Sequence, residues 1–509
     1  MSKVIKEYSL EDAIACTKYG KFNYFMIFLS GLVLACGMME TNCINIILPI
    51  AQCELNLSNV HKGLLGSVGY IGIILSSHFW GFMADTRGRK RVIVPALMLS
   101  FVFTVISTFS KTFWFLALFR FLNGFCVCAP QTIIYAFLGE FHSTHHRSRV
   151  LIIASVVYGL FVLIMPINGI AFLNRENWNL YIPGLNLNYN AWRIFMFMCS
   201  LPSFICAVVM IFFVPESPKF KYAQGDEAGT LQILQKIFKY NTGKSVDEYE
   251  VKTLIKDDEF LKGTEVNSKG FFYFMWSQTV PLFKSPHLKN QATACFLQFG
   301  ICVVSNGFWT FFPEILNKVS LWTEDNPNGS ATVCGVLDYF DRISTNSSIA
   351  INEDNPVCIK KLEFSTFQNI AMLTLLYSVF WFVISVVINK TGKLLIMVIV
   401  AAASGTSSIL LMFIQVPMAS VYIYLVLLLA GLNMSIVNTS TVELFPTTLR
   451  AMAVSISMMA GRIGSVAGSN FVGVSIKNFC TYTWLLPTIL LFSGGLLSFT
   501  IPNINKRIK

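Results

Sequence analysis

About twelve apolar runs, each close to the length of a membrane-crossing helix, divide this sequence of 509 residues. A helix that spans a bilayer needs about 20 mostly apolar residues. Only 13% of the residues are charged, whereas soluble domains carry about 25%. The pattern predicts a polytopic, all-α membrane protein. The predicted spans are 22–50, 62–84, 92–110, 113–138, 149–172, 192–214, 287–312, 366–388, 393–413, 418–440, 450–473 and 481–502.

Lysine and arginine residues gather in alternate short loops. Arg87, Arg89 and Arg91 follow the second span, whereas Lys62 stands alone after the first. Because cytoplasmic loops carry the excess of basic residues, we expect both termini in the cytoplasm. The predicted domains are a cytoplasmic N-terminal tail (1–21), a first six-helix half (22–214), a cytoplasmic linker with short helices (215–285), a second six-helix half (286–502) with an outer loop (313–365), and a cytoplasmic C-terminal tail (503–509).

The long linker between the halves contains apolar residues at helical spacing, namely Leu231, Leu234, Ile237 and Phe238. This spacing predicts short amphipathic helices lying under the bundle. Such helices could brace an intracellular gate, or the segment could be a plain linker.

The loop 313–365 is expected outside the cytoplasm, in the extracellular space or the lumen. Asn328 and Asn346 begin glycosylation sequons, and Cys334 and Cys358 lie in the same loop. Glycosylation and lasting disulfides both belong to that oxidising side of the membrane. We therefore predict glycans at the two asparagines and a disulfide between the two cysteines.

Two independent patterns indicate an internal repeat. Asp85 and Asn389 lie 304 positions apart, as do Gly88 and Gly392. The offset is 303 in a second pair of motifs, in which a glutamate is followed seven residues later by an arginine; these are Glu140 with Arg147, and Glu443 with Arg450. Agreement to within one residue predicts a duplicated six-span unit.

The first of these motifs resembles the signature loop of the major facilitator superfamily, G-x-x-x-D-x-x-G-R-[RK]. The residues that fit are Gly81, Asp85, Gly88, Arg89 and Lys90. Further motifs resemble the sugar and organic-ion branch: Arg120 in R-F-L-x-G, Trp192-Arg193, Pro215–Lys219 and Glu443–Arg450. A large glycosylated loop between spans 7 and 8 is similar to that of synaptic-vesicle-glycoprotein-2-like proteins. The resemblance implies the major facilitator fold, with twelve transmembrane helices in two six-helix halves, and secondary transport by alternating access.

Charged residues around the signature loops are predicted to form a cytoplasmic gate. Asp85 can meet the positive N-terminal end of span 11, and Arg89 can pair with Glu140. Alternatively, the basic residues only hold the loop inside. Asn389 carries no charge where the family has aspartate, so the second half should latch more weakly. The predicted gate residues are Gly81, Asp85, Gly88, Arg89, Glu140, Arg147, Asn389, Lys393, Glu443 and Arg450.

Glu40 in span 1 and Arg120 in span 4 are ionisable residues at similar depths within the membrane. Such residues are costly to bury and are usually functional. The resemblance to proton-coupled sugar porters implies that this pair titrates during transport. A permanent structural ion pair is the alternative.

Arg462 lies near the midplane of span 11, where transporter substrates usually bind. A cation at that depth favours an anionic substrate, although an arginine bonded to facing carbonyls would explain it too. Gln298, Trp309 and Asn433 are further candidates for substrate contact, and each could instead serve helix–helix packing.

These features predict a secondary transporter of a small organic solute, with a non-transporting membrane receptor or regulator as the alternative. We expect a small-molecule substrate, protons and the lipid bilayer as partners, and a monomer in the plasma membrane or a vesicle membrane. The net charge of +11 fits basic cytoplasmic loops, so nucleic acid is not an expected partner. No nucleophile–base pair, phosphate loop or metal-ligand spacing appears, so we expect no enzyme activity, cofactor or metal.

Overall fold

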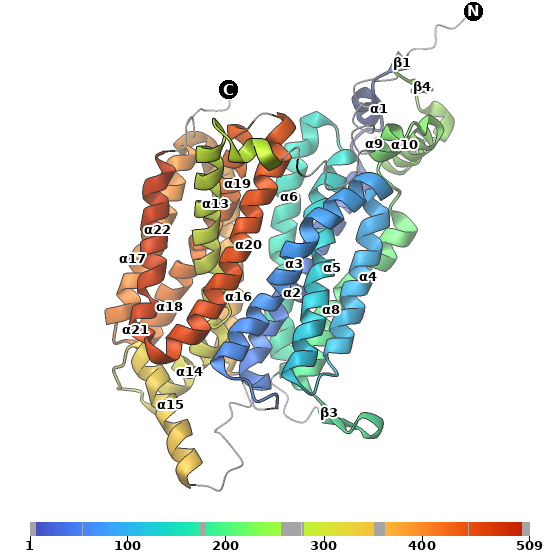
Figure 1. The fold of residues 1–509 in the computed structure, drawn as a ribbon. Helices are drawn as coiled ribbons and strands as arrows, with labels where there is room; N and C mark the ends of the chain where they lie inside the picture. The colour runs from blue at the N-terminus through green and yellow to red at the C-terminus, as the bar shows by residue number, and fades with distance from the viewer. Residues whose placement is uncertain are drawn as a thin grey trace, which may run out of the picture.

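The computed structural model describes residues 7–500 except 53, 174–178, 256–275, 277–278, 351–361 and 446. Helices α2–α8 gather on one side of the molecule, and α13–α22 gather on the other (Figure 1). The first group comprises α2 (Lys21–Ala51), α3 (Asn59–Arg87), α4 (Arg89–Ser107), α5 (Phe113–Glu140), α6 (Thr144–Val162), α7 (Ile164–Asn168), the π-helix η1 (Gly169–Leu173) and α8 (Ala191–Phe213).

The second group is built in the same way. It comprises η5 (Val280–Phe283), α13 (Leu288–Cys302), the π-helix η6 (Val303–Gly307), α14 (Phe312–Asp325), α15 (Val333–Ala350), α16 (Phe364–Thr391), α17 (Lys393–Phe413), α18 (Pro417–Leu428), η7 (Leu429–Leu432), α19 (Asn433–Leu444), α20 (Thr447–Asn478), α21 (Cys480–Thr483) and α22 (Leu485–Ser498).

Ten spans in the described residues are long and apolar enough to cross a membrane. The pair α13–η6 and α14, bent by 41°, makes an eleventh if it is counted as one span. The predicted count of twelve is reached only if α20 is added. This helix has 32 residues and packs along α3, but it contains Arg462 and many serines. A helix that faces the other half can be more polar than one that faces lipid.

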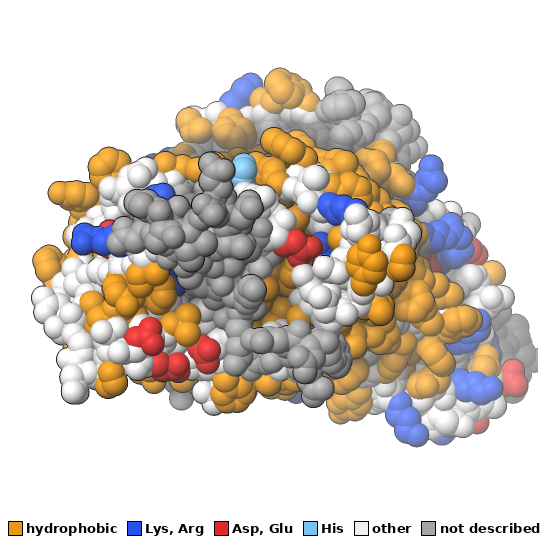
Figure 2. Space-filling model, turned by 90° about the horizontal axis from the view of Figure 1, so that it is seen from below, with side chains coloured by type: hydrophobic (Ala, Val, Ile, Leu, Met, Phe, Trp, Pro, Cys, Tyr) orange, Lys and Arg blue, Asp and Glu red, His pale blue; other side chains and the backbone are white. Residues whose placement is uncertain are grey.

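The bundle has two distinct ends, which we name by what they carry. The terminal end carries α1 (Leu10–Cys16), α9 (Pro218–Ala223) and α10 (Glu227–Thr242), and the loop end carries α15 and the hairpin that contains β3 (Figure 1). In the hairpin, β2 (Asn179–Ile182) pairs antiparallel with β3 (Leu187–Asn190) around η2 (Pro183–Leu185). At the loop end, scattered charged side chains lie between hydrophobic ones (Figure 2).

The internal repeat is visible in the backbone. Gly88 precedes α4 with φ +104° and ψ 151°, and Gly392 precedes α17 with φ +86° and ψ 154°. A positive φ is readily adopted only by glycine. The same strained conformation therefore recurs at the positions that the offset of 304 relates.

The N-terminal segment and the linker fold together at the terminal end. β1 (Glu7–Tyr8) pairs parallel with β4 (Thr253–Leu254), and α1 lies beside α10, which η3 (Val246–Glu248) follows. The predicted amphipathic helix is α10, because Leu234, Ile237 and Phe238 on it are buried. The buried Tyr249 donates its hydroxyl to the carbonyl of Ala13, which joins the linker to α1.

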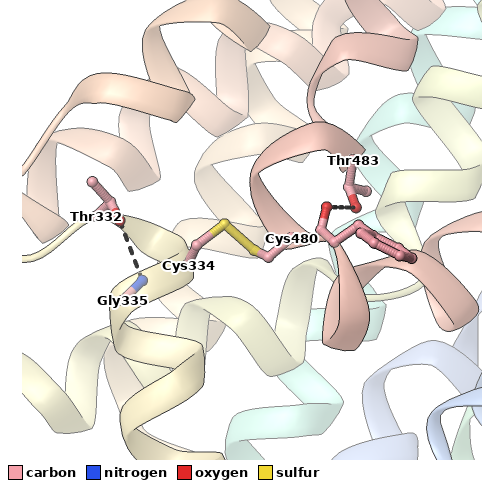
Figure 3. Close-up of a disulfide and its surroundings, with 6 residues drawn as sticks. Thr332, Cys334, Gly335, Cys480 and Thr483 are labelled. Carbon is pink, nitrogen blue, oxygen red and sulfur yellow. Dashed lines mark hydrogen bonds between the residues drawn. A yellow bond between two sulfur atoms is a disulfide. The ribbon is translucent and has the colours of Figure 1, made fainter.

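The segment predicted as an outer loop is partly helical, and its predicted disulfide is wrong. α14 continues the bent span, α15 follows it, and Cys334 at the start of α15 is bonded to Cys480 of α21 (Figure 3). Cys358 lies outside the described residues. The return of α21 to the loop end brings a cysteine 146 residues away within bonding distance, and spacing within the loop could not reveal this.

The hydrophobic core is shared between the halves at one end only, among the described residues. One buried cluster joins Met39, Ile44 and Leu65 of the first half to Phe308 and Trp484 of the second. The buried clusters nearer the terminal end draw their bundle residues from a single half. The two halves are therefore packed together at the loop end.

Candidate functional site

The Glu40 carboxylate lies fully buried within the first half, in a pocket of neutral hydrogen-bond donors. Ser100 and Thr104 of α4, Asn123 of α5 and Ser203 of α8 all donate to it, at 2.5 to 3.1 Å. Burial of a charge is expensive unless such partners satisfy it. Four donors from three helices therefore hold this carboxylate in one position.

Arg120 approaches Glu40 differently from the sequence prediction. Its guanidinium donates to the backbone carbonyl of Glu40 and, at 3.4 Å, to the thiol of Cys43. The described ion pairs do not include a contact between Arg120 and the Glu40 carboxylate. The prediction of a direct pair is corrected: the two residues are neighbours on α2 and α5, but the carboxylate points toward α4 and α8.

Arg462 reaches from α20 across the interface between the halves. Its guanidinium lies 4.0 Å from the sulfur of Cys128 on α5. Tyr70 and His78 of α3 are close enough to interact with its charge. No described carboxylate forms an ion pair with Arg462. A half-buried cation without an acidic partner can accept an anionic ligand.

The three other predicted substrate residues are not gathered around Arg462. Gln298 lies against Gly461, next to that arginine, and donates to Asn438 at 3.5 Å, while its side-chain oxygen has no hydrogen-bond partner. Asn433 instead donates to the Met397 carbonyl at 3.1 Å, within the second half.

Trp309 is also separate from Arg462, because it stacks on Phe312, with 5.5 Å between the ring centroids. Trp309 packs against the cluster shared by both halves at the loop end. Of the three candidates, only Gln298 is placed beside the arginine.

The signature loop of the first half is held by charges at the terminal end. Arg89 pairs with Glu140 at 3.1 Å, as predicted, and with Asp85 at 3.1 Å. The predicted contact of Asp85 with the start of α20 is not among the described contacts, and the Asp85 side chain is 58% exposed. A Cβ on Gly81 would meet nothing within 4 Å. The space beside Gly81 is therefore open in this structure.

Glu216 caps α4 from outside the helix. Its carboxylate accepts the backbone N–H groups of Lys90 at 3.0 Å and Arg91 at 3.3 Å. The first N–H groups of a helix have no intrahelical partner, and a negative charge there is favourable. This contact ties the segment after α8 to the signature loop.

The remaining predicted gate residues are less completely described. Arg147 pairs with Glu11 of α1 at 3.1 Å and donates to the Gly139 carbonyl. Lys393 is buried at the start of α17. Three of the predicted gate side chains lie outside the described residues, namely those of Asn389, Glu443 and Arg450. Of the predicted glycosylation sites, Asn328 is exposed at the loop end, and the side chain of Asn346 also lies outside the described residues.

Sequence reasoning missed one charged cluster that joins the halves. Lys62 of α3 pairs with Glu314 of α14 at 2.6 Å, and Lys318 pairs with Glu314 at 3.1 Å. The sequence prediction places Lys62 at the start of the second span, next to a short outer loop, and Glu314 in the long outer loop. The only sequence signal was the presence of charges next to predicted spans, which does not reveal a partner 252 residues away.

Residues 30–337 match the family model of the Major Facilitator Superfamily. The chain belongs to this superfamily. It is a multi-pass integral membrane protein, and its family points to transport rather than to enzymatic chemistry. The superfamily membership expected from the Gly81–Lys90 motif is confirmed.

Among curated proteins, the chain is similar to the synaptic vesicle glycoproteins 2. It is 25% identical to synaptic vesicle glycoprotein 2B from Homo sapiens over 314 residues, which are 58% of this chain and 46% of the relative. It is 24% identical to synaptic vesicle glycoprotein 2C from Rattus norvegicus over 317 residues, 59% of this chain and 43% of the relative. The chain spans less than half the length of these relatives.

Among solved structures, the fold is similar to that of the xylose transporter XylE from E. coli. The inward open conformation matches with a TM-score of 0.64 and 15% identity, covering 95% of this chain and 97% of that chain. The partially occluded inward open conformation matches with a TM-score of 0.62 and 14% identity, covering 95% and 100%. These matches establish the major facilitator fold.

Proposed function

We propose that this protein is a secondary active transporter of a small organic anion, working by alternating access. The single observation that supports the anion is Arg462, a half-buried guanidinium at the interface of the halves with no described acidic partner. An anion bound between the halves would neutralise it. The neighbouring Gln298 oxygen, which has no partner, could accept a hydrogen bond from a hydroxyl or amide of the same substrate.

The packing of the halves supports alternating access. They share a buried cluster at the loop end, whereas Asp85 is exposed and Gly81 meets no neighbour near the terminal end. In this arrangement a substrate would enter or leave from the terminal end. Rocking of the halves about Arg462 would then open the loop end.

Proton coupling is the second part of the proposal and rests on Glu40. Its carboxylate is held by neutral donors, and Arg120 binds the backbone instead. Protonation would therefore break no direct ion pair. The carboxylate could gain and lose a proton while the surrounding hydroxyl groups reorient to donate or accept.

We place the terminal end in the cytoplasm and the loop end outside or in a lumen. The Cys334–Cys480 disulfide and the exposed sequon at Asn328, both at the loop end, support this orientation. The protein would reside in the plasma membrane or in a vesicle membrane, and the names of the synaptic vesicle relatives favour a vesicle.

Substitutions at Arg462 test the anion site. In vesicles containing purified protein, Arg462→Ala should lower uptake of the transported anion by about ten- to a hundredfold, because charge-assisted bonds contribute about 1.5–3 kcal/mol. Arg342→Ala removes the same charge from an exposed position on α15 and should leave uptake unchanged. Normal anion uptake by a folded Arg462→Ala protein would refute the assignment.

A separate variant tests coupling. Glu40→Gln should abolish accumulation driven by a pH gradient while anion exchange across the membrane persists. Accumulation that still follows the pH gradient in this variant would show that Glu40 carries no proton. If no anion, cation or sugar is moved by the folded wild type, the alternative of a non-transporting receptor acting through its 313–365 segment replaces this proposal.

A further inference from the structure

Lys62 and Glu314 form an ion pair that bridges the two halves at the loop end. Their charged atoms lie 2.6 Å apart, and the Lys62 side chain is only 1% exposed. Lys62 lies in the first turn of α3, and Glu314 lies in the first turn of α14. The contact therefore joins two helices that must separate if the loop end opens.

Next to this pair, α3 of the first half and α20 of the second half are closely packed. A Cβ on Gly63 would lie 2.8 Å from the backbone oxygen of Ser469 on α20. One turn further along α3, Ser67 accepts a hydrogen bond from Asn470 of α20 at 3.0 Å. Backbones this close exclude water, which strengthens the electrostatic attraction between the ions.

Lys318 gives the cluster an asymmetry. It pairs with Glu314 at 3.1 Å from one turn along the same helix, so this contact moves with α14. If the halves separate, Glu314 keeps a cationic partner, while Lys62 loses its only described ion pair. The two ion pairs join both ammonium groups to the single Glu314 carboxylate, and Asp341 of α15 is close enough to Lys62 to interact with its charge.

From this geometry we infer that Lys62 and Glu314 are the latch that closes the outer gate of the transporter. The inference rests on the proposed alternating access. The latch stabilises the conformation in which the loop end is shut, and its opening uncovers Lys62 at the entrance of the cavity. Lys318 lowers the free energy of the open conformation, because it prevents Glu314 from being left without a partner.

The latch can be tested without any substrate by measuring how fast a reagent reaches a cysteine placed between α3 and α20. In purified protein, Ser67→Cys provides a thiol at a position that is fully buried in the closed conformation. The measured quantity is its rate of labelling by a charged maleimide, corrected for labelling of the parent protein. Adding Lys62→Gln or Glu314→Gln should raise this rate about tenfold or more, because the open conformation becomes more populated.

Three matched variants distinguish a latch from general destabilisation. Lys62→Arg keeps the charge and should restore slow labelling. Lys318→Gln leaves the contact between the halves intact and should not speed labelling. Glu54→Gln breaks the Arg193–Glu54 pair, which lies at the same end but within the first half, and should also leave the rate unchanged.

The latch is overturned if Ser67→Cys is labelled at the same rate with and without Lys62→Gln, provided that thermal denaturation shows both proteins to be folded. Fast labelling in Glu54→Gln as well would also overturn it, because the effect would then be general loosening of the loop end. Neither outcome depends on anion transport, so failure of the latch is distinguishable from failure of the proposed function.

Discussion

At the scale of single residues, the signature loop depends on a glycine for two physical reasons. Gly88 has φ +104°, a conformation that L side chains rarely adopt, and its missing side chain leaves room for the Glu216 carboxylate. The motif thus encodes a tight turn and a cap for α4 together. The spacing of Asp85, Gly88 and Arg89 therefore encodes local backbone geometry as well as charge.

Gly88→Ala should destabilise the protein by about 1–3 kcal/mol, the usual range for a strained backbone position. The added Cβ would lie 2.7 Å from a Glu216 carboxylate oxygen, so capping of α4 would weaken too. Thermal denaturation in detergent measures the change. Gly184→Ala is the control, since a Cβ there meets nothing within 4 Å. Equal midpoints for both variants would contradict this reading of the loop.

Glu40 offers a second prediction at this scale. Glu40→Ala would leave buried donors from Ser100, Thr104, Asn123 and Ser203 without an acceptor, which should cost at least about 1–3 kcal/mol, the usual penalty for one unsatisfied buried donor. Glu40→Gln retains one oxygen and should cost clearly less. Comparison of their unfolding midpoints tests whether the four donors act on the carboxylate, and equal midpoints would argue against it.

At the scale of elements, the Glu11 carboxylate fastens α1 to α6 of the first half and to α9 of the linker. Glu11 bonds Arg147 at 3.1 Å and also bonds Lys219. Partial burial raises the pKa of Glu11, but the bond and charge of Lys219 and the charge of Arg147 outweigh this and lower it below its usual 4.5. The ionised carboxylate therefore favours the docked tail.

The docking of α1 should depend on pH. Because the folded-state pKa is lowered, the stabilisation is complete above pH 4.5 and is lost as the pH falls through the lowered value. Proteolysis of residues 7–17 should speed up in that acidic range, and Glu11→Gln should give the fast rate already at pH 7. Asp338→Asn, which breaks an exposed pair on α15, serves as control. A tail cleaved equally fast in the wild type and Glu11→Gln at pH 7 would exclude this role.

The disulfide is the second element-scale feature with a direct test. The Cys334–Cys480 bond closes a loop of 146 residues. Closing a long loop stabilises a fold by about 2–4 kcal/mol. Cys480→Ser should therefore lower the unfolding midpoint as much as Cys334→Ser, and the double variant should add nothing further. Peptide mapping without reduction that finds Cys334 bonded elsewhere would contradict the pairing.

At the scale of the whole molecule, sequence patterns predicted contacts along the chain better than contacts between the halves. The apolar runs placed the spans to within a few residues, and the 304 offset predicted two glycines whose backbone conformations match. The Arg89–Glu140 pair followed from a motif. These signals are local or repeated, so one sequence contains them.

Contacts across the halves could not be predicted in this way. The Lys62–Glu314 pair and the partner of Cys334 depend on how α3, α14 and α21 are arranged in space. The orientation of the Glu40 carboxylate is a similar case. Hydropathy placed Glu40 within a membrane-spanning helix, but the choice between Arg120 and the hydroxyls of α4 depends on helix rotation.

The most direct test of the central claim is exchange of radiolabelled organic anions by the wild-type protein in sealed lipid vesicles, with organic cations and sugars assayed in parallel. The account predicts that at least one anion class exchanges, that the cations do not, and that Arg462→Ala loses the exchange. Folded protein that exchanges cations or sugars but no anion, or that moves no solute at all, would contradict it.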